Sequence, residues 1–211
     1  MQFRLLYEGE LSTTPGPKKK HEMRRYFHHQ LSHLWDTHPT LRLMKDQYVR
    51  FLTPERFPGF SQVPLSVFAD RFKIGAFRFV PLVCEAFATC CRLDIVYLRP
   101  QPHGPLINQY GDIDNRIKTL FDAFRLPQPG PEIEELTHET VGQDEDPFFC
   151  LLEDDSLITG FSVTADRLLA RKAPVANWPE KQTGHPENEV HLVVTVEVKL
   201  ARYAEINLPF A

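Results

Sequence analysis

The chain has no apolar run that approaches the roughly 20 residues a membrane-spanning helix needs. Residues 1–10 carry acids too early, and their apolar run is too short, for a secretory signal peptide. Internal repeats and low-complexity tracts are also missing. We therefore expect a cytoplasmic protein that does not interact with a membrane.

Cysteine is scarce, and its spacing argues against one common role. The four cysteines are Cys84, Cys90, Cys91 and Cys150. They form no C-x-x-C pair, so a zinc site built on cysteine is not indicated. We interpret them as reduced, partly buried thiols of a cytosolic protein.

An excess of positive charge is missing as well. The chain holds 24 Lys and Arg against 28 Asp and Glu, for a net charge of −4. Because phosphate contacts need clustered basic residues, the total charge does not indicate a general polyanion binder. The hydrophobic fraction of 42% is enough for a core. We expect a single domain over residues 1–211, with insertions near residues 39–80 and 126–150.

Strand and helix patterns both occur along the chain. Alternating or β-rich runs predict strands at residues 3–7, 75–83, 91–98, 159–169 and 190–200, and a helix is expected to end near Asp36. Together these patterns predict an α/β (α+β) fold, in which a mixed β-sheet has helices packed on one face.

Residues 111–124, G-D-I-D-N-R-I-K-T-L-F-D-A-F, join a close pair of acids to a helix. Asp112 and Asp114 are two residues apart, so in an extended segment their side chains point to the same side. Apolar residues follow at the spacing of one helical stripe: Ile117, Leu120, Phe121 and Phe124. Asp114 or Asn115 is a candidate N-cap for this helix. Lys118 would then emerge one turn after Asp114, near both acids.

A second acidic group follows at Glu153, Asp154 and Asp155. Carboxylates held close together repel one another unless a cation lies between them. Ligation by oxygen alone suits Mg²⁺ or Mn²⁺, which can activate a water and stabilise a phosphoryl oxygen. A nearby lysine adds positive charge for the phosphate. The alternative is that D-x-D-N is only a capping and turn pattern.

These two blocks resemble the signature of RusA-like Holliday junction resolvases, D-[LI]-D-N-x-x-K-x-x-x-D-A-L followed by D-D-[SA]-[QL]-[IV]. The matching residues are Asp112, Asp114, Asn115, Lys118, Asp122, Ala123, Asp154, Asp155, Ser156 and Ile158. The resemblance implies a Mg²⁺-dependent endonuclease, with Mn²⁺ as an alternative ion, that nicks branched DNA as a homodimer in recombination and repair. It implies these roles: Asp112, Asp114 and Asp155 as metal-binding catalytic acids, Asp154 beside the metal and Lys118 as the catalytic lysine.

The chain departs from the family pattern between the two blocks. A short loop joins them in the family, whereas residues 125–152 intervene here, and Leu157 stands where the family has Gln. We interpret residues 127–149, which are rich in proline and acids, as an exposed loop. The alternatives are a lid over the metal site or an acidic mimic of nucleic acid.

Basic and histidine-bearing positions lie on the first helix. The basic ones are Lys18, Lys19, Lys20, Arg24 and Arg25. They predict either a contact to the DNA backbone or a solvated helix start. His29 and His33 are spaced i, i+4, with Asp36 beyond, but a zinc site needs further ligands, so we favour a polar helix face. The aromatic and basic run at residues 39–79 favours core packing over stacking on bases.

Three functions remain open from the sequence. The first is the metal-dependent nuclease, in which Asp122 holds Lys118 across the i, i+4 spacing and Glu153 is an outer-sphere partner. The second is a catalytically weak or inactive nucleic-acid-binding or interaction protein. The third is a phosphoesterase that acts on small nucleotides.

Overall fold

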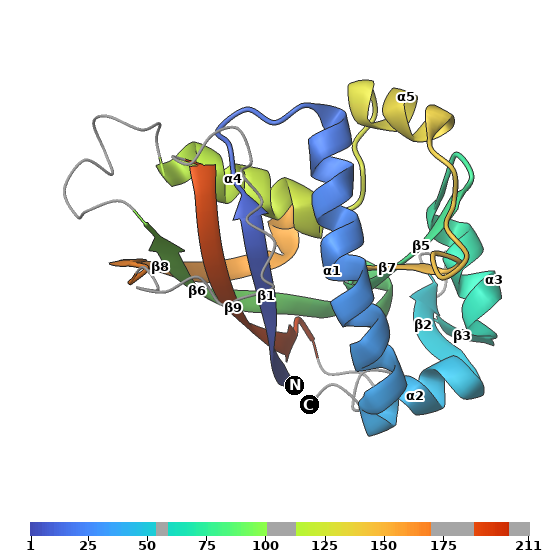
Figure 1. Ribbon diagram of the computed structural model, residues 1–211. Helices are drawn as coiled ribbons and strands as arrows, with labels where there is room; N and C mark the ends of the chain where they lie inside the picture. Colours follow the sequence, from blue (N-terminus) through green and yellow to red (C-terminus); the bar gives the residue numbers. More distant parts are fainter. Residues whose placement is uncertain (54–58, 101–112, 170–187, 203–211) are drawn as a thin grey trace, which may run out of the picture.

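The computed structural model describes residues 1–53, 59–100, 113–169 and 188–202 (Figure 1). The helices in these ranges are α1 (Pro17–Thr37), α2 (Pro39–Asp46), α3 (Leu65–Ala69), α4 (Ile113–Phe124) and α5 (Pro131–His138). The strands are β1 (Gln2–Glu10), β2 (Val49–Thr53), β3 (Gly59–Val63), β4 (Lys73–Ile74), β5 (Phe77–Val83), β6 (Thr89–Arg99), β7 (Phe148–Leu152), β8 (Ile158–Arg167) and β9 (Glu189–Leu200). Short 3₁₀ turns are η1 (Asp70–Phe72), η2 (Glu85–Phe87) and η3 (Asp155–Leu157).

The main sheet has four strands in the order β1-β9-β6-β8 (Figure 1). β9 runs antiparallel to both of its neighbours, while β6 and β8 are parallel. A parallel pair needs a crossover connection, and α4 lies in the stretch between β6 and β8. The expected mixed sheet is therefore confirmed.

Helices cover one face of this sheet. The ring centroid of Phe27 on α1 lies 5.6 Å from that of Tyr7 on β1. On α4, the ring of Phe121 lies 5.2 Å from that of Phe161 on β8. Side chains alternate between the two faces along each strand, and on β1, β6 and β9 those facing the helices are largely buried, including Leu5, Leu93, Ile95, Leu192 and Val194. Packing of helices on one face is thus confirmed.

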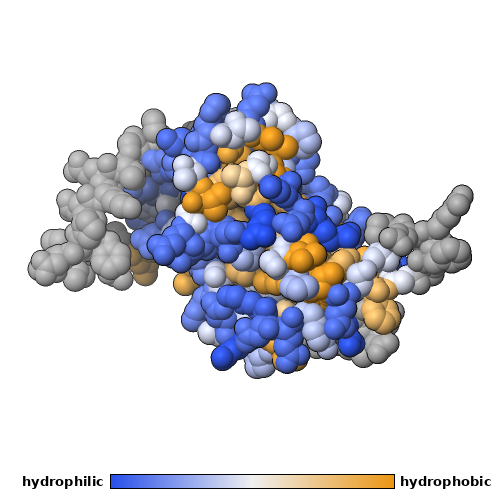
Figure 2. All heavy atoms as spheres, turned by 90° about the vertical axis from the view of Figure 1, so that its right-hand side faces the viewer, coloured by the Kyte–Doolittle hydropathy of each residue, from blue (hydrophilic) through white to orange (hydrophobic). Residues whose placement is uncertain are grey.

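A smaller sheet extends the fold beyond α1. β5 pairs in parallel with β7 and antiparallel with β4, while β2 and β3 form a separate two-stranded sheet. Aromatic rings from residues 39–80 pack into the core here: Phe68 lies 5.3 Å from Phe51, and 4.9 Å from Phe87 on η2, between ring centroids. The preference for core packing is confirmed for these rings. Apolar residues also reach the surface between hydrophilic ones on this side (Figure 2).

The acidic segment at residues 127–149 is more ordered than expected. It contains α5, which begins at Pro131 after Gly130, a glycine with a φ of 107°. Leu136 is buried in a small core with Phe77, Phe79, Leu126, Phe148 and Cys150. The interpretation of this segment as an exposed loop is wrong, because one apolar side chain anchors the helix and its carboxylates meet the basic residues of α1.

Among the helices described, none is both long and apolar enough to cross a membrane. The four cysteines are free, as expected; Cys90 is partly exposed and the other three are buried. Burial raises the pKa of the Cys91 thiol to about 12.

Candidate functional site

Helix α4 positions the first sequence motif. Its apolar stripe packs into the core as predicted, with Ile117, Leu120 and Phe124 buried. Asp114 and Lys118 are exposed on the remaining surface of the helix. Because α4 begins at Ile113, Asp114 lies within its first turn rather than before it as a cap. A carboxylate there still interacts favourably with the helix dipole.

Asp112 lies outside the described residues, so its position relative to Asp114 stays a prediction. Asn115 is exposed in the first turn of α4. Of the two acids of the pair, only Asp114 therefore lies in the described part of the chain.

The second motif meets α4 at its other end. Asp155 Oδ2 lies 4.0 Å from Nε of Arg125, the residue that follows the helix. The Arg125 guanidinium also pairs with Asp122 on the last turns of α4. The Asp154 carboxylate accepts a hydrogen bond of 3.0 Å from the Ser156 backbone N–H, which caps η3. That hydrogen bond holds the pKa of Asp154 below its ordinary value.

The described part of the chain therefore places the two acidic motifs along α4 rather than around one point. Arg125 links η3 to Asp122, which lies eight residues after Asp114. At the usual rise of about 1.5 Å per residue, this is about 12 Å along the helix axis. Within residues 1–53, 59–100, 113–169 and 188–202, no three His, Cys, Asp or Glu side chains are grouped so that they could hold a metal.

The donor chemistry nevertheless suits a hard cation at the beginning of α4. The motif offers only carboxylate oxygens there, which Mg²⁺ and Mn²⁺ prefer. Asp114 is exposed, so a metal that kept several water ligands would have room beside it. Asp112 and Asp114 are the residues that would hold such an ion, and Asp154 and Asp155 would have to approach from the other motif.

Glu153 has a structural contact of its own. Its carboxylate accepts a hydrogen bond of 2.9 Å from the Glu85 backbone N–H, and its backbone N–H donates to Val83 at 2.9 Å. Burial raises the pKa of Glu153 despite this hydrogen bond. Glu153 thus ties the end of β7 to β5 and η2, and its outer-sphere role at a metal stays a prediction.

Asp122 pairs with a different lysine from the one expected. Its Oδ2 lies 2.7 Å from Lys20 Nζ on α1, and its other oxygen pairs with Arg125. Burial alone would raise the pKa of Asp122, but Lys20 and Arg125 hold it below its ordinary value. The interpretation of Asp122 as the partner of Lys118 is therefore corrected.

Most of the basic residues on α1 are engaged with acids. Lys20 lies 3.0 Å from Glu132 on α5, and Arg24 pairs with the same carboxylate. The Arg24 side chain is 1% exposed and also donates to the backbone oxygens of Asp122 and Arg125. Burial of Arg24 lowers its pKa, while Glu132 opposes that change. Arg24 therefore joins α1, α4 and α5 from inside the protein.

Arg25 and Lys19 have partners as well. Arg25 donates to Glu145 at 2.7 Å and to Glu139 at 2.8 Å. Lys19 lies 3.5 Å from Glu22 and 3.8 Å from Glu10. Lys18 is exposed. The sequence predicted either a DNA contact or a solvated helix start for this basic run. Neither prediction holds for Arg24, because its side chain is buried.

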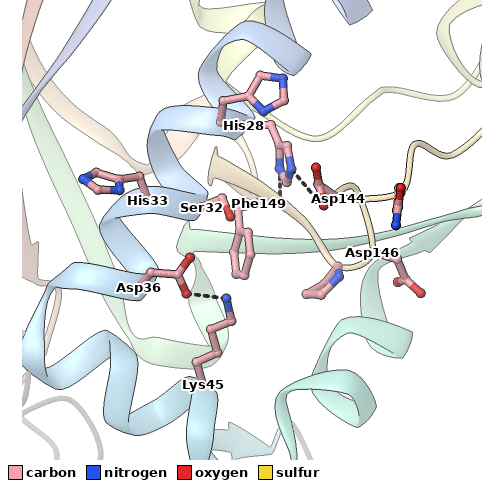
Figure 3. A pocket seen from close by; sticks show the side chains of 11 residues that line it. His28, Ser32, His33, Asp36, Lys45, Asp144, Asp146 and Phe149 are labelled. Carbon is pink, nitrogen blue, oxygen red and sulfur yellow. Dashed lines mark hydrogen bonds and ion pairs between the residues drawn. The ribbon is translucent and has the colours of Figure 1, made fainter.

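Three histidines of α1, His28, His29 and His33, border a polar hollow of about 520 Å³ whose other lining residues lie on α1, α2 and residues 143–149 (Figure 3). His28 accepts a hydrogen bond of 2.8 Å at Nδ1 from the Phe149 backbone N–H, so Nε2 donates to the Asp144 backbone oxygen, 2.9 Å away. Asp36 pairs with Lys45 at this hollow. His28 was not among the predicted functional residues, although it lies three residues before Leu31 and seven before Trp35, which places it on the buried face of α1.

Comparison of the chain with protein-family models, with curated proteins and with solved structures finds no significant match.

Proposed function

We propose that the chain is a structure-selective endodeoxyribonuclease similar to RusA-like Holliday junction resolvases, acting on branched DNA in recombination or repair. One observation carries the proposal. β6 precedes the first acidic motif, α4 carries it, and β8 follows the second motif in parallel with β6. The crossover between β6 and β8 therefore carries the first motif on α4 and the second motif beside the end of α4. The two motifs follow one another in the order that the resemblance requires.

Asp114 and Lys118 would form the reacting end of this unit. They lie one turn apart on α4, and both are exposed. Asp112 and Asp114 would hold Mg²⁺ or Mn²⁺, which when bound supplies charge to the scissile phosphate and an activated water. The Lys118 ammonium would bind a phosphate oxygen and stabilise the charge that develops on it.

Asp154 and Asp155 enter the proposal as the acids of the second motif. Asp155 is exposed, and its 4.0 Å contact with Arg125 is a loose ion pair. The proposal requires this contact to open and η3 to move along α4 toward Asp114 before Asp155 can approach the ion. The Arg125 side chain is 11% exposed and that of Asp155 is 51% exposed, so loss of the ion pair itself costs roughly 1 kcal/mol.

The path of the DNA would pass over the start of α1 at Lys18, with Lys19 beside it. Lys20, Arg24 and Arg25 are engaged with Asp122, Glu132, Glu139 and Glu145, so we propose no direct DNA contact for them in this arrangement. The exposed cations at this end are therefore fewer than the sequence suggested.

The proposal is tested by cleavage of a labelled four-way junction and of a linear duplex, each with Mg²⁺, Mn²⁺ or EDTA. Nicking that needs the metal, prefers the junction and is lost in Asp114→Asn supports it. Asp155→Asn should lose cleavage to a similar extent. If both variants cleave the junction as fast as the wild type does, the two acids have only a structural role at the start of α4 and in η3. The proposal then fails.

A catalytically inactive interaction protein is the second candidate. The observations that favour it are the separation of Asp114 from Asp155 along α4 and the neutralisation of Lys20, Arg24 and Arg25 by α5 and the residues after it. Binding of the junction without cleavage in any metal would establish this candidate. A small-nucleotide phosphoesterase has less support, since the hollow described above is lined by α1, α2 and residues 143–149 rather than by α4.

A further inference from the structure

Two aromatic rings of the run at residues 39–80 stay outside the core. Phe60 on β3 is 57% exposed, and Tyr48, the residue before β2, is 36% exposed. Phe51 and Phe68, from the same run, are buried. A single exposed apolar side chain is ordinary on a protein surface, whereas several on one face mark an interaction site. The position of the two exposed rings relative to each other therefore matters.

Both rings lie on the outer face of the ribbon that β2 and β3 form on the right-hand side of Figure 1. Side chains alternate along a strand, so Arg50 and Leu52 share the face opposite the buried side chains of β2. Leu52 pairs in register with Phe60 on β3, and Arg50 pairs with Gln62. The Arg50 guanidinium carbon lies 5.5 Å from the centroid of the Tyr48 ring, which places that ring on the same face. We name this surface, made of these five residues, the β2–β3 platform.

The positive charge around the platform is not balanced by acids. The described parts of residues 39–80 hold six basic residues against two acidic ones. Three of the six form ion pairs: Arg42 with Asp46, Lys45 with Asp36, and Arg78 with Asp70 and Asp146. The other three have no carboxylate partner among the described residues: Arg50, Arg71 and Lys73. This region is therefore locally positive, although the chain as a whole carries a net charge of −4.

Two of these unpaired cations flank β2. Arg50 lies on the platform, where its Nε donates a hydrogen bond of 3.2 Å to the Gln62 side chain. The guanidinium carbon of Arg71 lies 4.5 Å from the centroid of the Phe51 ring, which belongs to the other face of β2. A guanidinium that stacks on a ring keeps N–H groups for a phosphate, which it binds with two parallel hydrogen bonds. The surroundings of β2 thus combine exposed rings with cations that suit phosphate.

We propose that the β2–β3 platform binds single-stranded nucleic acid, with Phe60 and Tyr48 stacked on unpaired bases and Arg50 on the phosphate backbone between them. Every base has a π-face, so this contact suits a strand of any sequence. Tyr48 lies four strand positions from Leu52, the partner of Phe60, which is about 13 Å along β2. Arg50 is midway, so a strand stacked on both rings passes over its guanidinium.

The charge favours a nucleic acid over a protein partner. An apolar protein surface would contact Leu52 and Phe60, but it would also cover the Arg50 guanidinium, which brings no carboxylate of its own. Burial of an unpaired cation is costly. A phosphate backbone supplies the missing negative charge along its whole length. DNA and RNA share this chemistry, so the platform itself sets no preference between them.

The inference goes beyond the proposed nuclease and does not depend on it. The platform uses none of the proposed metal-binding or catalytic residues, and stacking on a base needs no metal. Binding can therefore be measured in EDTA, where the proposed cleavage cannot occur. Loss of binding and loss of cleavage are then separate results.

The first test is fluorescence anisotropy of labelled oligo(dT), oligo(U) and a duplex of the same length, with the full chain in EDTA. We expect either single strand to bind more tightly than the duplex, and Phe60→Ala to weaken that binding about tenfold or more through the loss of one stacked base. Val67→Ala on α3, at a residue that is 49% exposed outside the platform, is the control and should bind as the wild type does. A wild type that binds neither single strand, or prefers the duplex, would overturn the proposal and favour a protein partner for the exposed rings.

The second test separates stacking from a general apolar contact. Phe60→Trp keeps a π-face and should retain the affinity, whereas Phe60→Leu keeps apolar surface without a ring and should weaken binding as much as Phe60→Ala does. Arg50→Gln should reduce the slope of log affinity against log salt concentration by about 0.7, the value for one phosphate of a single strand. If Phe60→Leu binds as tightly as the wild type, with all variants folded by circular dichroism, the Phe60 ring does not stack on bases and the proposal fails.

Discussion

Lys20 Nζ lies 2.7 Å from Asp122 Oδ2, which ties the basic start of α1 to the helix that carries Asp114 and Lys118. Lys118, one turn before Asp122, is exposed instead. The pairing of Asp122 with α1 and with Arg125 thus leaves the Lys118 ammonium directed to solvent rather than committed to a neighbour on its own helix. A lysine with that exposure is available for a phosphate.

The ion pair between Arg24 and Glu132 should be important for folding. Glu132→Gln leaves the Arg24 guanidinium buried without its carboxylate, which should lower the free energy of unfolding by about 3 kcal/mol. Urea denaturation at neutral pH measures the change. Glu134→Gln, an exposed position on the same helix, is the control and should change stability by less than about 0.5 kcal/mol. Equal stability of the two variants would contradict the proposed role of this pair.

Stability should fall as the pH decreases through the range of histidine titration. Burial, with Arg25 and Arg24 nearby, lowers the pKa of His21 from 6.5 to about 4. Between these values the unfolded chain binds the proton and the folded chain does not, so the folded state loses stability as pH falls. For one such group the loss from pH 6.5 to about pH 5 is about 2 kcal/mol. His28, whose pKa is also lowered mainly by burial, acts in the same direction.

His21→Phe isolates this contribution. The His21 ring lies between Phe77 and Phe148, with centroids at 5.1 Å and 5.7 Å, so a phenyl ring suits the site. Denaturation curves recorded from pH 7 to 5 should show a weaker pH dependence in this variant, whereas His33→Gln on the exposed face should retain it. If the free energy of unfolding of His21→Phe depends on pH as steeply as that of the wild type, His21 is not the source of the pH dependence.

Gln30→Ala should expose the edge of β1. The variant removes two hydrogen bonds to Leu6, and we expect a loss of about 1 kcal/mol in the free energy of unfolding. Aggregation on heating should also increase, because an edge strand with free backbone groups is a template for pairing. His29→Ala, the exposed neighbour on α1, is the control for light scattering and for stability. Identical behaviour of both variants would show that the Gln30 contact does not protect the edge.

Lys118→Ala should affect the reaction and leave the fold intact. The residue is exposed, so the free energy of unfolding should change by less than about 0.5 kcal/mol. Loss of one transition-state cation should reduce single-turnover cleavage by about 100-fold or more. Lys18→Ala should instead weaken DNA binding and reduce its dependence on salt concentration. The cleavage rate at saturating DNA should change little. A fully active Lys118→Ala would remove this lysine from the proposed site.

Local patterns in the sequence predicted much of the fold. The stripe of Ile117, Leu120 and Phe124 identified α4, and the alternation along residues 190–200 identified β9, because burial periodicity is a property of a single element. The four-stranded sheet and its helical face followed from these elements. Which acid meets which base did not follow: Lys20 and Glu132 are 112 residues apart, and only the tertiary fold brings them together.

The candidate site shows the same limit. The motif predicted the placement of Asp114 and Lys118 on one helix correctly, since four residues make about one turn. The convergence of Asp155 with Asp114 depended on where the chain returns after residues 125–152. The return brings η3 to Arg125 at the end of α4, because the backbone of Leu126 hydrogen-bonds to Leu152 and fixes β7 there.

The most direct test of the nuclease proposal is single-turnover cleavage of a labelled four-way junction by the wild type and by Asp114→Asn, with Mg²⁺ or with EDTA. The proposal predicts nicks in the wild type with Mg²⁺, none with EDTA, and a loss of about 1,000-fold or more in the variant, which should still bind the junction. Cleavage that persists in Asp114→Asn, or a wild type that binds the junction but never cuts it, would contradict the proposal.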